Sequence, residues 1–181
     1  MPKIIVPISN GFEEIEAISI IDICRRAKIE VSIAAVENIQ TIGAHNIKIE
    51  ADCKIEDVNS NDFDMIVLPG GLPNAFTLAQ NERVQFLLKE FKQKNKKIAA
   101  ICAAPYALHT ANVLNENYTC YPSFEHKIKL NGYKENDSVV IDKDIITSRG
   151  PATAMEFALE IVRTLCSKEI YTDVKNSLLA K

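Results

Sequence analysis

Cys102 is the residue of this sequence best placed to act as a nucleophile. It ends the apolar run KIAAIC and is followed at once by AAPYALHTAN, a helix-forming segment with Pro105 near its first turn, where proline costs little. A cysteine between a strand and a helix stands on a tight turn, a nucleophile elbow, where unpaired backbone N–H groups stabilise a thiolate or an oxyanion. We therefore predict that Cys102 is the most reactive of the five cysteines, although a buried structural role is the commoner use of a free thiol.

Glu16 is the second candidate, in the helix-length segment Glu13 to Ala27. At helical spacing it shares a stripe with Ile20 and Ile23, whereas a surface glutamate would have polar neighbours there. An apolar environment raises the pKa of a carboxyl, and a protonated carboxyl donates a hydrogen bond to a thiolate. The alternative is that Glu16 is solvated, as we expect for the two glutamates that open the segment.

The glycines of Pro69-Gly70-Gly71 follow another apolar run, DMIVL. Glycines at the end of a strand let a backbone N–H approach a bound group closely, and a plain tight turn uses the same residues. The sequence contains neither the G-x-x-x-x-G-K-[ST] pattern of a phosphate loop nor G-x-G-x-x-G after its first strand. A nucleotide-binding role is therefore not favoured.

The three histidines are not placed by the sequence to serve Cys102 as a base. His109 lies in the helical segment after Cys102, and His45 and His126 lie in polar, loop-like contexts, so we interpret each as a surface residue. The cysteines are widely spaced and never form C-x-x-C, which argues against a zinc site and a disulfide framework. We predict free thiols at all five positions: Cys24, Cys53, Cys102, Cys120 and Cys166.

The composition is that of an ordinary globular chain: 21 Lys and Arg against 24 Asp and Glu give a net charge of −3 on 181 residues, with 47% hydrophobic residues. This balance argues against disorder and against a specific contact with nucleic acid. A chain of this length buries roughly 70% of its unfolded surface, so we expect one domain over residues 1–181. The N-terminus does not match a secretion signal, and the apolar stretch Ile98 to Leu108 is too short to span a bilayer. We expect a cytoplasmic protein without membrane contact.

The elements that must position these residues follow from the alternation of short apolar runs with helix-length segments. The runs are apolar throughout, which indicates strands buried on both faces, and their alternation with helices predicts a doubly wound, mostly parallel sheet sandwiched by helices. Ligands bind such sheets beyond the carboxyl ends of the strands, where Cys102 and Gly71 lie. The predicted strands are Lys3–Ile8, Ile29–Val36, Asp64–Leu68, Lys97–Cys102 and the pair Ser138–Ile141 and Ile145–Ser148. The predicted helices are Glu13–Ala27, Glu82–Lys94, Ala104–Asn112, Ala152–Cys166 and a short amphipathic one from Lys168, before an irregular end at Lys181. Turns are expected at Asn131, Gly132, Asn136 and Asp137.

Four motifs, GFEEIEA, VLPGG, AAICAAP and TSRGP, occur in an order and spacing that resemble the DJ-1/ThiJ/PfpI superfamily, on the branch of the parkinsonism-associated protein. The resemblance covers nearly the whole chain. It implies a flavodoxin-like α/β sandwich, usually a homodimer, with an oxidation-prone nucleophile at Cys102. It also implies that Glu16 is the protonated glutamate bonded to this cysteine, and that Gly71 and the elbow amides of Cys102 and Ala103 are backbone donors.

Some members of this superfamily place a histidine beside the nucleophile. At the corresponding position, in TCYPSFEHK, this sequence has Tyr121 instead. Arg26 matches an arginine that in relatives lies near the dimer interface and the partner's site. For Arg149, in TSRGP, a role in the site and a role in packing at a helix start both stay open. Peptidase relatives have C-H-G, and glutamine amidotransferases have G-x-C-x-G with a later H-x-E; neither pattern is present.

The resemblance implies two functions of different classes. One is an enzyme without metal or cofactor that acts on reactive dicarbonyls such as methylglyoxal, either free (a glyoxalase) or attached to glycated proteins (a deglycase). There Cys102 would form a hemithioacetal and Glu16 would move protons. The other is a redox sensor or chaperone in which Cys102 is oxidised to a sulfinic acid. Both use the same two residues, so the sequence leaves both open. A homodimer is also expected because apolar positions surround much of the first helix: Ile15, Ile18, Ile20, Ile21 and Ile23.

Overall fold

The computed structural model describes residues 1–180 and is built on a seven-stranded sheet. Neighbouring strands are parallel except β10 and β11, which form an antiparallel pair at one edge. In spatial order the strands are β10 (Val139–Asp142), β11 (Ile145–Ser148), β7 (Lys97–Ile101), β6 (Met65–Leu68), β1 (Lys3–Ile8), β2 (Glu30–Ala35) and β5 (Cys53–Lys54). Two small two-stranded sheets add β3 (Gln40–Ile42) with β4 (Lys48–Glu50), and β8 (Asn117–Tyr118) with β9 (Gly132–Tyr133).

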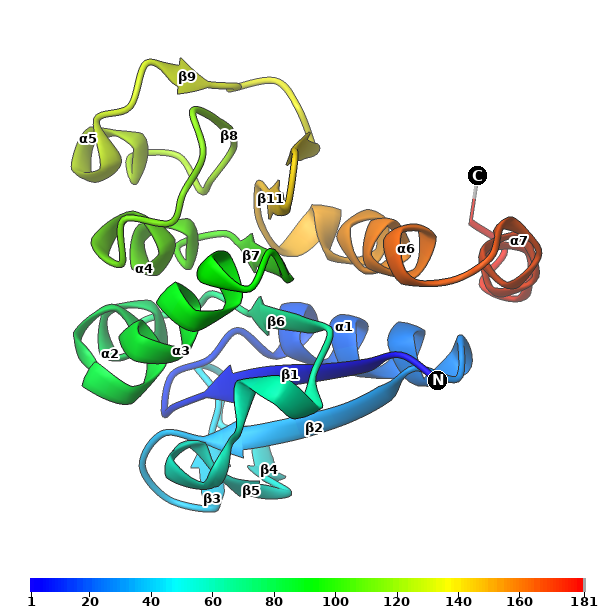
Figure 1. The fold of residues 1–181 in the computed structure, drawn as a ribbon, viewed down its shortest axis with the longest axis horizontal. Helices are drawn as coiled ribbons and strands as arrows, with labels where there is room; N and C mark the ends of the chain where they lie inside the picture. The colour runs from blue at the N-terminus through cyan, green and yellow to red at the C-terminus, as the bar shows by residue number, and fades with distance from the viewer. Residues whose placement is uncertain (181) are drawn as a thin grey trace.

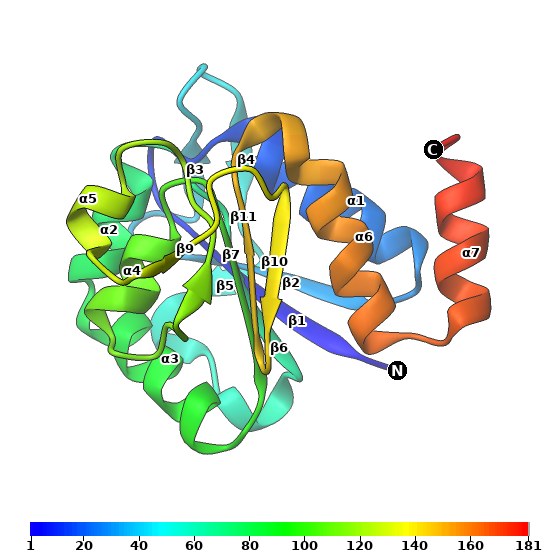
Figure 2. The ribbon, with the colours of Figure 1, turned by 90° about the horizontal axis from the view of Figure 1, so that it is seen from above.

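Helices cover both faces of this sheet (Figures 1 and 2). One face carries α1 (Glu14–Arg26) and α6 (Ala154–Leu165), with α7 (Lys168–Ser177) outside α6; the other carries α2 (Asn74–Gln80), α3 (Glu82–Gln93) and α4 (Pro105–Thr110). The short α5 (Glu125–Ile128) and three 3₁₀ turns (Ile55–Asp57, Ser60–Asp62 and Pro151–Thr153) complete the elements. Within residues 1–180 no helix has both the length and the apolar character needed to cross a membrane.

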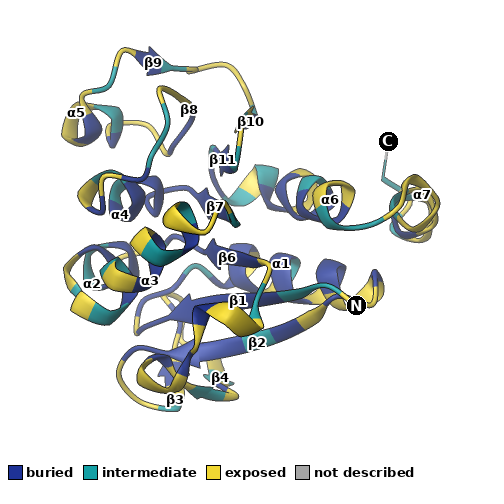
Figure 3. Ribbon diagram, viewed as in Figure 1, coloured by how far each residue is buried: buried dark blue, intermediate teal, exposed yellow. Residues whose placement is uncertain are grey.

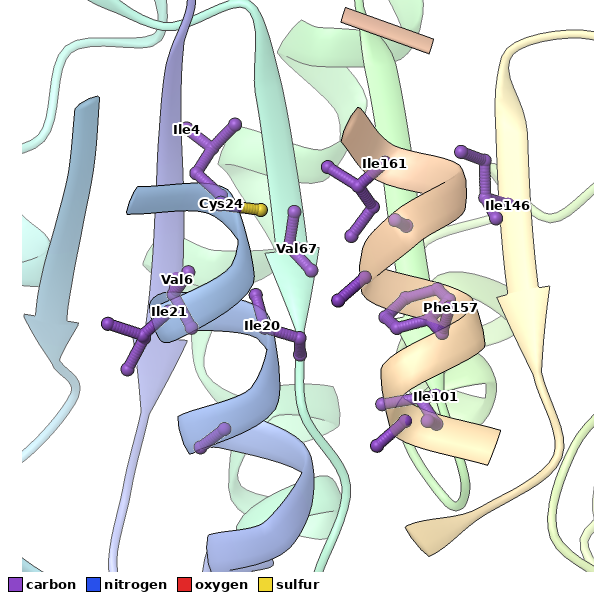
Figure 4. Close-up of a cluster of buried hydrophobic side chains, with 14 of the residues drawn as sticks. Ile4, Val6, Ile20, Ile21, Cys24, Val67, Ile101, Ile146, Phe157 and Ile161 are labelled. Atoms are coloured by element: carbon purple, nitrogen blue, oxygen red, sulfur yellow. The ribbon is translucent and has the colours of Figure 1, made fainter. Parts of the chain in front are cut away.

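The core explains why the strands are apolar throughout. In β1, Ile4 and Val6 pack in the cluster beneath α1 and α6, whereas Ile5 between them packs beneath the helices of the other face. Figure 4 shows the first cluster, in which Ile20 of α1 and Phe157 of α6 face the sheet. Each such side chain contributes about 1.5–3 kcal/mol on full burial. Figure 3 shows that these central strands are buried, whereas most of α7 is exposed or of intermediate burial.

The predicted fold class is confirmed, and the predicted strands and helices lie within about two residues of those observed. The sequence analysis missed the short elements, the edge strand β5, α2, α5 and the two small sheets, because runs of two to seven residues carry little periodic signal. The turn predicted at Gly132 is wrong, since Gly132 lies in β9, where a side chain would meet the Glu116 carbonyl. Lys181, part of the predicted irregular end, lies outside the described residues.

Candidate active site

Cys102 stands on a strained turn between β7 and α4. Its φ of +65° lies in the left-handed region, which is rare for a residue other than glycine. Two backbone hydrogen bonds hold this conformation: Cys102 N–H donates to the Ser148 carbonyl (2.9 Å), and the Cys102 carbonyl accepts from Tyr121 N–H (2.8 Å). Pro105 occupies the first turn of α4, as predicted. The predicted strand-to-helix elbow is therefore present, and it is tied to β11 and to the loop after β8.

A pocket of about 450 Å³ opens beside the thiol. Cys102 is 7% exposed, so a reagent reaches its sulfur through this pocket. The pocket walls come from several loops that meet at the carboxyl ends of the strands: Glu13, Ala44, Gly71, Leu72, Ala103, Tyr121, Ser123, Phe124 and Pro151. This is the edge of the sheet at which the sequence analysis expected a ligand.

Glu16, in the first turn of α1, is fully buried next to this cysteine. Its Oε2 accepts a hydrogen bond from Gly70 N–H (2.7 Å), whereas its buried Oε1 has no hydrogen-bond partner among the described residues. Gly70 separates the two side chains: a methyl group there would lie 2.7 Å from Cys102 Cβ and 2.8 Å from Glu16 Oε2. Glycine at this position therefore permits the close approach of carboxyl and thiol.

The two groups perturb each other's protonation. Burial raises the pKa of Glu16 to about 7, against the lowering effects of Gly70 N–H and of Cys102, and the charge of Glu13 adds to the rise. Burial also raises the pKa of Cys102, as does the negative charge of Glu16. The predicted rise for Glu16 is confirmed. At Cys102 burial is the larger cause, so a proton on Glu16 relieves only the part of the rise that comes from its charge.

Gly71 and Ala103 supply the backbone donors that the resemblance implied. The N–H groups of both residues lower the pKa of Cys102, which means that they stabilise its thiolate. Gly71 has a φ of +88°, and a side chain there would meet the backbone of Gly11 and Glu13. Glycine is therefore required to present this N–H. The sequence analysis identified these two donors but missed Gly70 as the donor to Glu16. Its expectation for the Cys102 amide is wrong, because that N–H is used on the Ser148 carbonyl (2.9 Å).

Of the three other predicted site residues, Tyr121 lines the Cys102 pocket, whereas Arg149 and Arg26 do not. Tyr121 lines the pocket and bonds the elbow through its backbone. Arg149 instead donates to the Tyr133 hydroxyl (3.3 Å) and to the Glu135 carbonyl, which fastens the segment around β9. Arg26 lies at the other end of α1, about 15 Å along the helix from Glu16, and pairs with Asp22 (2.7 Å). Within one chain, Arg26 is thus not part of this pocket.

Glu14 is a buried carboxylate whose environment the sequence analysis misjudged. It was expected to be solvated, but it is 4% exposed because the β3–β4 hairpin folds over it. Its Oε1 accepts from His45 N–H (2.6 Å), and its Oε2 lies 2.9 Å from His45 Nδ1. Burial acts to raise the pKa of Glu14, but the hydrogen bonds from His45 and Ile47 outweigh it and the net direction is down. His45 itself is exposed, as predicted.

A metal could be ligated by Glu13, Glu14 and His45, whose ligand atoms all lie within 4.8 Å of one another. The Glu14 oxygens already accept hydrogen bonds from His45, so we interpret the group as the clamp that holds the hairpin. No histidine is among the residues that line the Cys102 pocket.

Comparison with known proteins identifies relatives over nearly the whole length. Residues 2–164 match the DJ-1/PfpI family. Protein DJ-1 homolog B of Arabidopsis thaliana is 38% identical over 93% of this chain, which spans only 39% of that protein. The glutathione-independent glyoxalase DJR-1.2 of Caenorhabditis elegans is 38% identical, with 84% of this chain and 82% of the relative covered. The glutathione-independent glyoxalase DJ-1 of Schizosaccharomyces pombe is 33% identical over 98% of both chains.

Solved structures agree with this relationship. The crystal structure of Drosophila melanogaster DJ-1beta superposes with a TM-score of 0.95 at 36% identity and covers 99% of this chain and 98% of its own. The seven-stranded sheet and its two helical layers are therefore the fold of that protein as well.

Proposed function

Because the chain belongs to the DJ-1/PfpI family, we propose that it is a cofactor-independent glyoxalase that converts dicarbonyls such as methylglyoxal to hydroxy acids. Cys102 is its nucleophile and Glu16 its proton carrier. Two relatives named as glutathione-independent glyoxalases support this reaction class. The observation that carries the proposal is the buried Glu16 carboxyl beside Cys102, with one oxygen on Gly70 and the other unpartnered within residues 1–180.

In the first step the Glu16 carboxylate takes the proton of the Cys102 thiol, and the resulting thiolate attacks the aldehyde carbon of the dicarbonyl. The new C–S bond pushes the carbonyl electron pair onto oxygen, and the resulting alkoxide accepts hydrogen bonds from the N–H groups of Gly71 and Ala103. Protonated Glu16 then gives its proton to this oxygen, which completes a hemithioacetal. Its pKa of about 7 keeps both of its protonation states populated near neutral pH.

In the second step the Glu16 carboxylate removes the hydrogen from the carbon that bears sulfur, and an enediol forms. The proton returns to the neighbouring carbon, so one carbon is oxidised to a thioester while the other is reduced to an alcohol. Water then hydrolyses the thioester, which frees the Cys102 thiol and releases lactate. The sum is methylglyoxal plus water giving lactate, and it needs no outside oxidant or reductant.

The decisive assay measures lactate formed from methylglyoxal at steady state. We expect Cys102→Ser to reduce turnover by about 10³-fold or more, because a hydroxyl without a base is a poor nucleophile. Cys53→Ser is the matched control, since Cys53 lies on the edge strand β5 away from the pocket. Equal turnover in wild type and Cys102→Ser would refute the proposal.

On a dicarbonyl adduct of an amine or thiol, the Cys102 thiolate would displace that amine or thiol, which leaves with a proton from Glu16, and the same hemithioacetal forms. This step would make the protein a deglycase for glycated proteins. The competing function is a redox sensor or chaperone that acts through oxidation of Cys102. Absence of lactate, together with clean conversion of Cys102 to sulfinic acid by peroxide, would favour the sensor. Limited alkylation with iodoacetamide, mapped by mass spectrometry, separately tests whether Cys102 is the most reactive of the five thiols.

A homodimer in the cytoplasm completes the proposal. Ile15 and Ile18 of α1 are 58% and 45% exposed, whereas Ile20, Ile21 and Ile23 of the same helix are buried in the chain's own core. The two exposed isoleucines form an apolar face that a second copy would cover. Sedimentation should give a species of twice the 20.2 kDa chain mass at micromolar concentration, and a monomer alone would contradict this.

A further inference from the structure

A second cavity lies next to the Cys102 pocket, and Tyr121 stands at the boundary. The second cavity has a volume of about 240 Å³ and is lined by Tyr121, Pro122, Arg149, Gly150, Pro151, Ala152 and Thr153. Tyr121 and Pro151 line both spaces, so they form the shared wall. Pro151 is held in the 3₁₀ turn that leads into α6, which leaves the Tyr121 side chain as the part of the wall that can be changed.

The backbone fixes the position of this wall relative to the nucleophile. Tyr121 N–H donates to the Cys102 carbonyl (2.8 Å), and the Tyr121 carbonyl accepts from Phe124 N–H (3.1 Å). Its ring packs on Gly150, where an added methyl group would lie 3.3 Å from Tyr121 Cδ2. Tyr121 therefore stands directly beside the elbow and borders both cavities, while 47% of it stays exposed.

The chemistry of the second cavity favours an apolar group. Pro122, Pro151 and Ala152 offer carbon surface, and Arg149 uses its Nη1 atom on Tyr133 and Glu135. Tyr121 is 47% exposed, and within residues 1–180 its hydroxyl is not tied to another side chain, so the side chain acts through the size of its ring. An aromatic or branched substituent on a dicarbonyl would fit this space if the ring were absent.

We propose that Tyr121 determines how far a substrate can extend: its ring, 47% exposed, separates the Cys102 pocket of about 450 Å³ from the second cavity of about 240 Å³. The proposal rests on the proposed glyoxalase function and adds the residue that sets its specificity. Shortening this side chain joins the two cavities and admits dicarbonyls with an aromatic substituent.

The first test compares kcat/KM for phenylglyoxal and methylglyoxal in wild type, Tyr121→Ala and Tyr121→Phe. We expect the phenylglyoxal to methylglyoxal ratio to rise by about 10-fold or more in Tyr121→Ala, the usual scale for opening an apolar subsite. Tyr121→Phe keeps the ring, so its ratio should stay near that of wild type. Tyr121→Leu provides a second shortened variant, with a smaller expected rise, in case the alanine variant does not fold.

A second test is independent of dicarbonyl turnover. The Cys102 thiolate displaces iodide from iodoacetamide and from N-benzyl iodoacetamide, and mass spectrometry of the Cys102 peptide gives each alkylation rate. Relative to wild type, Tyr121→Ala should raise the rate with the benzyl reagent over that with iodoacetamide by about 10-fold. If wild type forms no lactate, the glyoxalase proposal fails while this measurement still tests the wall. An unchanged reagent ratio in Tyr121→Ala and Tyr121→Leu would overturn the role of Tyr121.

Discussion

Two glutamates at the start of α1 are buried to a similar degree, yet their environments shift the pKa of the carboxyl in opposite directions. Glu14 is 4% exposed and Glu16 is fully buried. The Glu14 carboxylate receives backbone N–H groups from the hairpin and the His45 imidazole, and its pKa falls. Glu16 receives one N–H group, from Gly70, and its pKa rises to about 7.

The difference shows that burial alone does not make a carboxyl reactive. A buried carboxylate whose oxygens are satisfied by hydrogen bonds stays ionised and serves the fold. One that keeps an unpartnered oxygen holds a proton near neutral pH and can exchange it with a neighbour. Glu14 is thus a clamp for the β3–β4 hairpin, and Glu16 is a candidate proton carrier for Cys102.

The largest expected effect is the loss of turnover when Glu16 is substituted. Glu16→Gln should reduce methylglyoxal turnover by about 10²-fold or more, because an amide cannot exchange a proton. It also removes the negative charge that raises the pKa of Cys102, so the thiol should titrate at lower pH than in wild type. Thiolate absorbance followed against pH tests this.

Glu16→Leu is the matched variant for that prediction. It removes the same charge but leaves no polar group beside the sulfur, so the thiol of Cys102 should titrate at higher pH than in Glu16→Gln. Turnover should be lost in both variants. If both titrate and turn over like wild type, Glu16 has no role in the site.

The next effect is a pH-dependent contribution of Glu16 to stability. Its pKa is raised from 4.5 to about 7 on folding, so the folded chain retains a proton that the unfolded chain loses. Wild type should therefore lose stability relative to Glu16→Gln as pH rises from about 4.5 to about 7, by up to about 3 kcal/mol. Urea unfolding of both proteins across this range measures the difference. A difference that does not change with pH would show that Glu16 titrates normally.

A smaller effect is expected when Glu14 is substituted, and it concerns the stability of the fold rather than turnover. Glu14→Gln leaves one oxygen to accept hydrogen bonds from the hairpin, and we expect a loss of about 1–3 kcal/mol in the free energy of unfolding. Turnover per folded molecule should fall far less than in Glu16→Gln. A loss of turnover equal to that of Glu16→Gln would erase the distinction between the two carboxyls.

The smallest effect is expected at His45, which is exposed and whose pKa is raised by its hydrogen bond to Glu14 and by the charge of Glu13. A raised histidine pKa gives stability that is present at low pH and is lost as pH rises through that pKa. His45→Ala should therefore lower the melting temperature slightly at pH 6 and leave it nearly unchanged at pH 9. An equal loss at both pH values would assign the effect to packing.

The sequence predicts the central layers of this molecule because their signal is local and periodic. Runs such as Lys97–Cys102 are apolar on both faces, and the helical stripe of Glu16 and Ile20 is readable without a structure. Cys102, Glu16 and Gly71 were identified in this way and through the four motifs. In the structure Cys102 and Gly71 line one pocket, and Glu16 is buried next to Cys102 without lining it.

What the sequence did not predict depends on contacts between distant segments. Glu14 and His45 are 31 positions apart, and neither lies in a pattern that indicates the other. The raised pKa of Cys102 likewise depends on how deeply the folded chain buries its thiol next to Glu16. The wall formed by Tyr121 depends on two cavities that exist only after folding.

The protonation state of Glu16 is the most direct test of this account, and infrared spectroscopy reports it through the stretching band of a protonated carboxyl. At pH 6 wild type should show this band, and Glu16→Gln should lack it. Glu14→Gln should keep it, because Glu14 is ionised in wild type. In wild type the band should disappear as pH rises through about 7. If wild type and Glu16→Gln have the same carboxyl spectrum at pH 6, Glu16 is ionised like Glu14 and cannot be the proton donor to the substrate of Cys102.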